Sequence, residues 1–209
     1  VTADFFDFED NGWRYLVTPT SLGDSEIADG SPPHPGYGPG NWKHPGFDDS
    51  GWPSGRALLG YGTITNTTVN TTIGSGPDLF DKYPTTYFRR EFNVSDAAMV
   101  SRLLVNVIRD DGAILYINGH ELGRSNMNAG NQSYDNLASA DANPENAVIS
   151  LEFILPPGVL REGINVLAIE VHQRSSSSSD LGIDAEVKGT IANSGITLTQ
   201  SGVLKARLL

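Results

Sequence analysis

Apolar and polar residues alternate over most of the second half of the chain, and this pattern predicts β-strands. In YFRREFNV, residues 87–94, the alternation places Phe88 and Phe92 on one face and Tyr87 and Arg89 on the other. Further strand-like runs lie at 102–108, 113–117, 148–156, 164–173 and 181–191. The segment SDAAMVS at 95–101 predicts no more than a single helical turn.

Two short polar segments interrupt these runs and predict turns. Asn118-Gly119 is typical of a two-residue type I′ hairpin, in which both central residues need a positive φ. Asp110, Asp111 and Gly112 separate two other apolar runs, and we expect them to form the turn of a hairpin. Aspartate favours turns because its side chain bonds nearby backbone groups, and Gly112 would supply a permissive φ.

The first half of the chain is dominated by segments that block regular structure. Residues 1 to about 30 contain FFDFEDNGWRYLVTP, which predicts one or two strands. Residues 29–55 are dense in proline and glycine, so we expect a long loop there, and it contains Trp42 and Trp52. Residues 57–84 begin as a strand and continue as a second polar, glycine-rich loop.

The pattern as a whole predicts an all-β fold with roughly eight to ten strands, a β-sandwich or jelly roll with long Pro/Gly-rich loops. No heptad and no fixed-period repeat is present. We expect one domain over residues 1–192. Residues 193–209 would be a terminal strand or the start of a linker or neighbouring module.

Composition and charge exclude several classes of function. The chain has 25 acidic and 14 basic residues and a net charge of −11, which argues against a nucleic-acid partner. It has no cysteine, so it has neither disulfides nor a cysteine-based zinc site. No apolar run approaches the roughly 20 residues of a membrane span. The sequence contains no known catalytic motif. With 25 acidic residues, however, two carboxylates at the separation that a glycosidase requires remain possible.

The high content of glycine, proline, serine, threonine and asparagine is typical of a secreted protein. Four N-x-[ST] triplets, at Asn66, Asn70, Asn93 and Asn131, agree with that expectation. We therefore expect an extracellular monomer.

Three segments together resemble a known fold family. YFRREFNV, LLVNVIRDDGAILYINGHELGRSNM and GINVLAIEVHQRSSSSSDLGIDAEV are similar to the galactose-binding-domain-like jelly rolls of secreted bacterial multidomain proteins. FDDSGW at 47–52 is similar to the opening of the sugar-binding domains of β-galactosidases and rhamnosidases. The resemblance covers roughly residues 13–187. It implies a carbohydrate-binding module, but relatives also use this scaffold for adhesion or as a spacer.

The aromatic residues of the long loops are the main candidates for sugar binding. Sugars stack their C–H faces on tryptophan and tyrosine rings, while nearby polar groups bind the hydroxyls. His172, which ends a strand, would be a polar residue at the lip of the site or a hydrogen-bonded structural residue. Trp52 also fits a plug at one end of the sandwich. The aromatic candidates are Tyr37, Trp42, Trp52, Tyr61 and Tyr83.

Asp110 and Asp111 are candidate ligands for a structural Ca²⁺, a cation that needs several oxygen donors. The segment also resembles the protective-antigen-like adhesin domains, where an Asp-Asp pair before glycine holds calcium that in turn binds a glycan. The alternative is a purely structural turn.

Taken together, the sequence predicts a non-catalytic carbohydrate-binding module. It would target the catalytic domain of the same parent chain to a polysaccharide or glycan. The alternatives are a structural or adhesive spacer that binds no sugar, and a glycan-cleaving enzyme.

Overall fold

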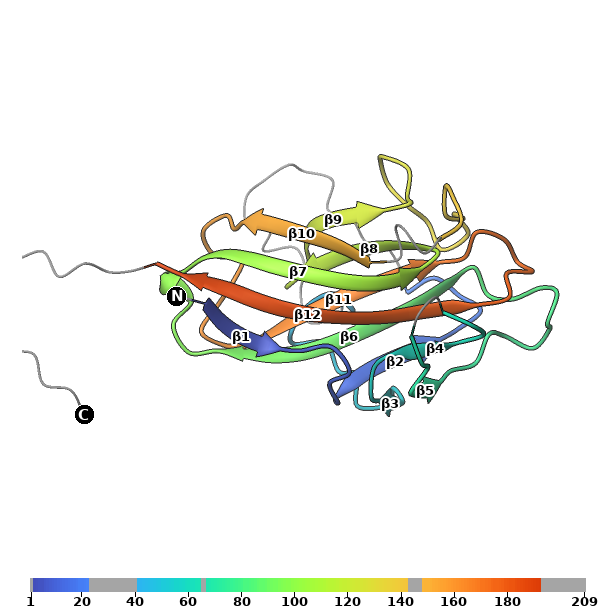
Figure 1. Ribbon diagram of the computed structural model, residues 1–209, viewed down its shortest axis with the longest axis horizontal. Coiled ribbons are helices and arrows are strands. Elements are labelled where there is room, and N and C mark those ends of the chain that lie inside the picture. Colours follow the sequence, from blue (N-terminus) through green and yellow to red (C-terminus); the bar gives the residue numbers. More distant parts are fainter. Residues whose placement is uncertain (1, 23–40, 65–66, 143–147, 193–209) are drawn as a thin grey trace, which may run out of the picture.

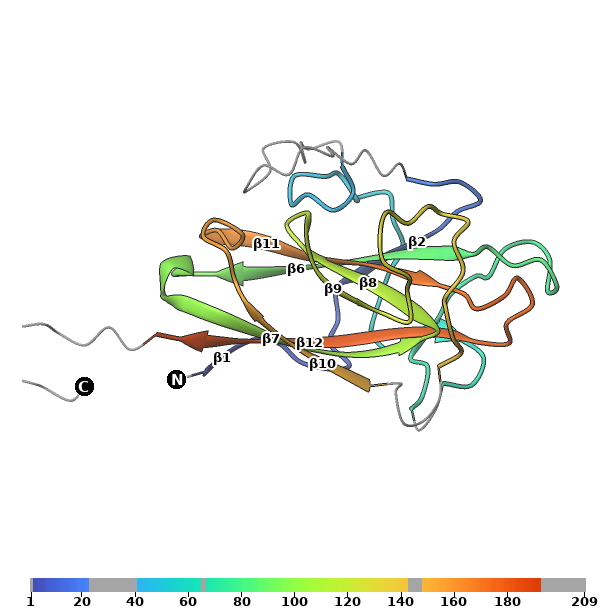
Figure 2. The ribbon, with the colours of Figure 1, turned by 90° about the horizontal axis from the view of Figure 1, so that it is seen from above.

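Two β-sheets, packed face to face, make up the computed structural model of the chain (Figures 1 and 2). The structure describes residues 2–22, 41–64, 67–142 and 148–192. Within these residues there are twelve strands and one short 3₁₀ helix, η1 (Ala97–Met99). The all-β sandwich predicted from the sequence is therefore confirmed.

The first sheet, sheet A, has the order β10-β7-β12-β4-β5, and β1 also pairs with β12. Its strands are antiparallel except for the parallel pair β4 and β5. The bounds are β1 (Thr2–Phe6), β4 (Leu59–Tyr61), β5 (Thr71–Thr72), β7 (Val100–Asp110), β10 (Val148–Ile154) and β12 (Leu181–Ile191).

The second sheet, sheet B, has the order β3-β2-β6-β11-β8-β9, and all of its pairs are antiparallel. The bounds are β2 (Trp13–Val17), β3 (Ser54–Gly55), β6 (Thr85–Val94), β8 (Gly112–Ile117), β9 (His120–Ser125) and β11 (Gly163–His172). Two strands, β1 and β2, occur in the first 22 residues, where the pattern predicted one or two.

The core lies between the sheets and consists of alternate residues of their strands. On β6, Phe88 and Phe92 join this core, while Tyr87 and Arg89 point to the other face of sheet B, as the alternation predicts. Each fully buried Leu, Ile, Val or Phe side chain contributes about 1.5–3 kcal/mol. Core residues of the long strands include Leu103, Val105, Val107, Leu115, Leu167, Ile169, Ile183 and Ala185.

The Asn-Gly turn is confirmed as the hairpin between β8 and β9. Asn118 has φ 51° and Gly119 has φ 87°, the positive values that a type I′ turn requires. The Asn118 amide also reaches outside the turn, donating to the Val159 carbonyl at 2.7 Å and to Asn165 Oδ1 at 2.7 Å. Its Oδ1 accepts the Val166 N–H at 2.9 Å. The turn is thus tied to the start of β11.

The prediction of a hairpin around Asp110 and Asp111 is wrong. β7 belongs to sheet A and β8 to sheet B, so the chain crosses from one sheet to the other at this point. Gly112 does not have a positive φ. A Cβ at Gly112 would lie 2.6 Å from Met127 Sδ and 2.8 Å from Ala138 Cβ, so glycine is needed there for space.

Other expectations fall partly outside the described residues. The single helical turn expected at 95–101 appears as η1. Residues 193–209 and most of the proline-rich loop before Asn41 are not described, so the expected domain boundary stays a prediction. In the described part of the chain, no helix has the length and apolar character needed to cross a bilayer.

Replacing Asn118 with alanine should lower the free energy of unfolding by about 2 kcal/mol, because buried partners lose their hydrogen bonds and the turn loses a residue that tolerates positive φ. Urea unfolding measures this change. Asn128→Ala, at an exposed position, is the matched control and should have little effect. Equal stability of the two variants would contradict the proposed tie between turn and strand.

Candidate functional site

The loop at 41–53 covers the outer face of sheet B, the face that points away from the core (Figure 2). Trp42 is 1% exposed and lies edge-on to Tyr87 and Tyr116, with ring centroids 4.9 Å and 6.1 Å away. Trp52 is 8% exposed and packs edge-on to Phe47 at 5.7 Å. Trp52 thus packs on the outer face of sheet B and not at an end of the sandwich, where a plug was expected. Both indoles belong to a second apolar cluster.

Arg89, at the centre of β6, fastens this loop to the sheet. Its side chain is fully buried. Its Nε donates to Asp49 Oδ2 at 2.6 Å, and its Nη1 donates to the carbonyls of Trp42 and His44. The guanidinium carbon lies 5.2 Å from the centroid of the Phe47 ring. One arginine therefore holds both ends of the 42–49 segment against the sheet.

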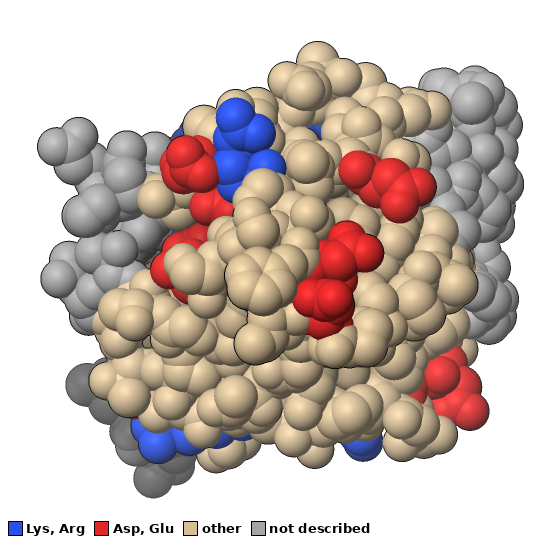
Figure 3. All heavy atoms as spheres, turned by 90° about the vertical axis from the view of Figure 1, so that its right-hand side faces the viewer, with Lys and Arg blue, Asp and Glu red and all other residues tan. Residues whose placement is uncertain are grey.

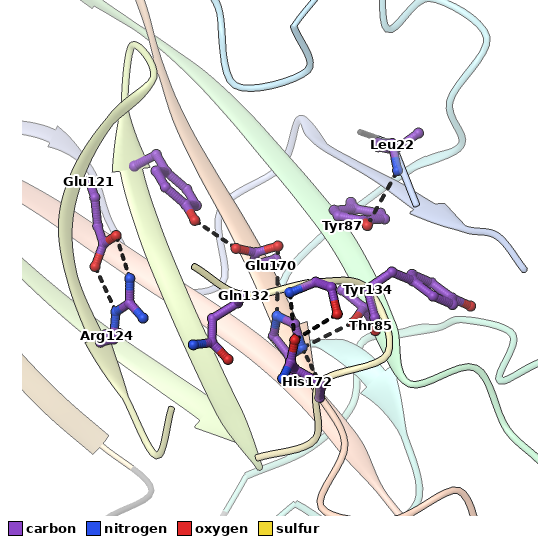
Figure 4. A network of polar contacts seen from close by, with 12 residues as sticks. Leu22, Thr85, Tyr87, Glu121, Arg124, Gln132, Tyr134, Glu170 and His172 are labelled. Carbon is purple, nitrogen blue, oxygen red and sulfur yellow. Dashed lines mark hydrogen bonds and ion pairs between the residues drawn. The ribbon is translucent and has the colours of Figure 1, made fainter. Parts of the chain in front are cut away.

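A buried polar network lies beside this cluster (Figure 4). Tyr116 donates its hydroxyl to Glu170 Oε1 at 2.6 Å, and Glu170 Oε2 lies 3.6 Å from His172 Nε2. On the other side of the ring, His172 Nδ1 lies 2.8 Å from the Asn136 carbonyl and 3.0 Å from Thr85 Oγ1. Because a carbonyl only accepts, Nδ1 carries the proton and donates.

The environment of Glu170 favours its charged form. Burial by itself raises the pKa of this carboxyl, but the contact with His172 and the positive charge of Lys43 outweigh burial, so the pKa lies below its ordinary value. Lys43 Nζ also lies 4.0 Å from the centroid of the Tyr116 ring. The network thus joins the 41–53 loop, β8, β11 and the loop after β9.

Four of the predicted site residues come together at one end of the sandwich, which we call the loop end. Tyr61 ends β4, Tyr83 precedes β6, and Asp110 and Asp111 form the crossing between β7 and β8. This end faces right in Figure 1 and faces the viewer in Figure 3, where acidic side chains appear at several places. Trp42 and Trp52 are buried on the outer face of sheet B. His172 ends β11 next to this end and is fully buried, and Tyr37 lies outside the described residues.

Two residues of the loop end were missed by the analysis of the sequence. Gln173, the first residue after β11, is fully buried and donates its Nε2 hydrogen to the Tyr61 hydroxyl. Phe80, in the loop before β6, is 80% exposed. An aromatic residue between aspartates in a glycine- and proline-rich loop was the available signal for Phe80. Gln173 gave no signal beyond its position at the end of a strand.

Asp111 has a structural role in this arrangement. Its Oδ1 accepts the N–H of Ala142 at 2.9 Å, and its Oδ2 accepts the N–H of Arg174 at 2.8 Å. Its backbone carbonyl accepts from Arg109 Nη1 at 2.7 Å. Asp111 thereby connects the sheet crossing with the loops that follow β9 and β11.

Asp110 has a different environment, although it is the next residue. Its side chain is buried, and its Oδ1 has no hydrogen-bond partner among the described residues. Burial, the negative charge of Asp111 and that of Asp180 raise its pKa to about 7, against the opposing charge of Arg109. Gln173 Oε1 also lacks a partner there. Burial likewise raises the pKa of Tyr61.

These oxygens do not by themselves complete a calcium site. Calcium takes about six to eight oxygen ligands. Both carboxylate oxygens of Asp111 accept backbone N–H groups, and among the buried side chains that the structure describes at this end, Asp110 and Gln173 each have one oxygen without a partner. Within the described residues, no three His, Cys, Asp or Glu side chains are placed to hold a metal. Calcium at the aspartate pair therefore stays a prediction.

No protein-family model matches the sequence, and no curated protein matches it either. Solved structures similar to the fold include a Bacteroides uniformis β-glucuronidase (15% identity, TM-score 0.47, 90% of this chain and 18% of that chain). An uncultured Clostridium sp. β-glucuronidase shows 14% identity and a TM-score of 0.46, covering 91% of this chain and 29% of that chain. A Bacteroides vulgatus β-glycosidase shows 17% identity and a TM-score of 0.38, covering 90% and 20%. The chain thus spans less than a third of these proteins, and similarity at this level assigns no function.

Replacing Arg89 with methionine should release the 41–53 loop, because Asp49 and two carbonyls lose their buried partner. We expect the free energy of unfolding to fall by about 3 kcal/mol. Acrylamide quenching of tryptophan fluorescence should rise in the folded variant. Arg102→Met, which breaks an exposed pair with Glu152, is the control and should change neither quantity much. Unchanged quenching in Arg89→Met would show that other contacts hold the indoles.

Replacing Asp110 with asparagine should stabilise the protein at neutral and alkaline pH. In the folded state the Asp110 pKa is about 7, whereas the unfolded chain releases this proton near pH ~4. Between these values the folded state binds more protons, so its stability falls as pH rises. Asparagine does not titrate. The variant should therefore gain more than about 1 kcal/mol above pH 7, and the gain should vanish below pH ~4.

Chemical unfolding across pH 3–9 measures this difference. Asp135→Asn, at an exposed position, is the control. A gain for Asp110→Asn that is constant across the whole pH range would contradict the assignment.

Proposed function

We propose that this chain is a non-catalytic carbohydrate-binding module that targets a linked enzyme to a polysaccharide. The observation that carries the proposal is the loop end. There, loops from both sheets gather Tyr61, Tyr83, Asp110 and Gln173. In this proposal the partners are the glycan and the catalytic domain of the same parent chain, and the module acts outside the cell as a monomer.

The polar groups of the loop end suit sugar hydroxyls. Asp110 and Gln173 each have an oxygen without a hydrogen-bond partner in the described chain. An unsatisfied buried acceptor costs about 1–3 kcal/mol. Both side chains are buried, so a sugar hydroxyl that donates to these oxygens has to displace part of the loops that cover them. The Tyr61 hydroxyl accepts a hydrogen bond from Gln173, so the Tyr61 ring lies beside these polar groups.

The loop before β6 adds an apolar surface to the same end. Leu79 is 72% exposed and Phe80 is 80% exposed. Lys82 holds this loop in place, because its ammonium donates to the carbonyl of Leu79 at 2.8 Å and to that of Ser178 at 2.6 Å. A rigidly held, exposed aromatic ring is the group on which a pyranose ring stacks.

Charge at the loop end favours a neutral glycan. Asp180 lies near Asp110, since its charge raises the pKa of that group. Asp78 and Asp81 flank the exposed Leu79 and Phe80 in the sequence. Carboxylates at this end repel a uronate, so a neutral polysaccharide binds there with less electrostatic cost.

The course of the chain leaves the loop end accessible. Thr2 pairs with Thr190, so β1 begins where β12 ends. The loop end lies at the other end of β12, whose 11 residues span about 35 Å. Thr2 and Thr190 therefore lie at the end of the sandwich opposite the candidate site (Figure 1).

A spacer domain without sugar binding is the second candidate. The burial of Trp42 and Trp52 favours it, because these rings present no stacking face to a ligand while the loop is closed. This observation concerns sheet B and leaves the groups at the loop end unexplained.

A panel of soluble neutral polysaccharides and uronate polymers, tested by affinity gel electrophoresis and calorimetry, measures the proposed activity. We expect a neutral glycan to bind, and Phe80→Ala and Tyr83→Ala each to weaken it by about tenfold, roughly 1.4 kcal/mol. Ile154→Ala removes a side chain that is 74% exposed at the opposite end, and should bind normally.

The same glycan-binding measurements, made with added calcium and with a chelator, test whether calcium at Asp110 and Asp111 contributes to binding. Binding of no glycan in either condition would favour the spacer. Binding that survives both aromatic substitutions would place the glycan site elsewhere on the module.

A further inference from the structure

A recess lies on the outer face of sheet A, beside the loop end. It is a cavity of about 310 Å³ lined by Phe8, Glu9, Leu58, Thr67, Thr68, Ile108 and Asp184. Sites for small ligands begin at about this size. The lining combines an apolar wall with hydroxyl and carboxyl groups.

Asp184 is the unusual group of this cavity. It lies on β12 and points away from the core, and its side chain is only 2% exposed. Its Oδ2 accepts the Glu9 N–H at 2.9 Å, and its Oδ1 accepts the Ala185 N–H at 2.7 Å. Each oxygen therefore keeps one lone pair for a further donor.

The described positively charged side chains near Asp184 pair with other acidic residues. Glu9 pairs with Arg56 at 2.6 Å, and Asp10 pairs with Arg90 at 2.6 Å. Farther along β12, Lys188 pairs with Glu186 at 2.9 Å. In the described part of the chain the nearby cations are thus already paired, and Asp184 forms no ion pair. Burial and the charges of Glu9 and Asp10 raise its pKa to about 6.

A buried carboxylate without a counter-ion is costly. We propose that this cavity binds a protonated primary amine, with the Asp184 carboxylate as its counter-ion. The ammonium group donates to the free lone pairs of Asp184 and to the hydroxyl of Thr67, whose Oγ1 is buried without a partner in the described residues. The carbon frame of the ligand packs on Leu58 and Ile108.

The same features disfavour a metal ion. Backbone N–H groups occupy one side of each Asp184 oxygen, and the Glu9 carboxylate is engaged by Arg56. No cluster of three metal-binding side chains occurs in the described residues. A primary ammonium needs only about three acceptors, whereas calcium needs about six to eight oxygens.

Two sources offer this ammonium chemistry, an amino sugar and a lysine side chain. NMR titration of the ¹⁵N-labelled protein with glucosamine and with lysine amide distinguishes them. N-acetylglucosamine is the matched probe, since it differs from glucosamine by an amide in place of the ammonium. We expect saturable shifts of the Thr67, Thr68, Ile108 and Asp184 amides with at least one ammonium probe and none with N-acetylglucosamine.

Asp184→Asn should weaken the binding at least tenfold, whereas Asp135→Asn, at an exposed position, should not. Thr68→Trp provides a second test, because it adds bulk at an exposed residue that lines the cavity and leaves Asp184 unchanged. Affinity for the ammonium probe should also rise between pH 5 and pH 7, as Asp184 ionises.

Equal binding of N-acetylglucosamine in the cavity would overturn the proposal. Full affinity for the ammonium probe in both Asp184→Asn and Thr68→Trp would also overturn it. The absence of saturable shifts with glucosamine and with lysine amide at millimolar concentrations would do the same. The proposal does not depend on the glycan site, because the ammonium group is held by Asp184, which is not among the residues proposed to bind the glycan.

Discussion

The rest of the structure depends on one carboxylate, that of Asp111. The chain leaves sheet A and enters sheet B at this residue, so its neighbours belong to different layers of the sandwich. Its two side-chain oxygens accept N–H groups from Ala142 and Arg174, which lie in two separate loops. Hydrogen bonds to a charged acceptor contribute about 1.5–3 kcal/mol each, more than those between neutral groups. The positions of these loops, and of Gln173 beside Arg174, follow from this single side chain.

A second constraint is the cover on sheet B. Arg89 holds the 41–53 loop, and the Glu170 and His172 network holds the loop after β9. With both loops in place, Trp42 is buried, and this part of the outer face of sheet B offers no aromatic ring to a ligand. The two sites that we propose therefore lie on surfaces outside this cover. These are the loop end and the recess on sheet A.

The sequence predicts the long strands well because their alternation is set by burial of one face. Apart from the Asn-Gly hairpin of β8 and β9, it does not predict which strands pair. β7 and β8 are consecutive but do not pair with each other: β7 pairs with β10 and β12, and β8 pairs with β11 and β9. Arg89 shows the same limit. It stands at a polar position of an alternating strand, and only the loop that folds over it makes it fully buried. Loops rich in proline and glycine carry no periodicity, so the burial of Trp42 could not be derived.

The aspartate pair shows how neighbouring residues of the same type take opposite roles. Each oxygen of Asp111 accepts a backbone N–H from a different loop, so displacing this carboxylate would release a loop. Asp110 is also buried, yet its Oδ1 has no hydrogen-bond partner in the described chain. The charged form of Asp110 therefore lowers the stability of the fold. A group that costs stability and faces no internal partner gains most from an external donor. In the proposed site, that asymmetry assigns the contact with a ligand to Asp110 and a structural role to Asp111.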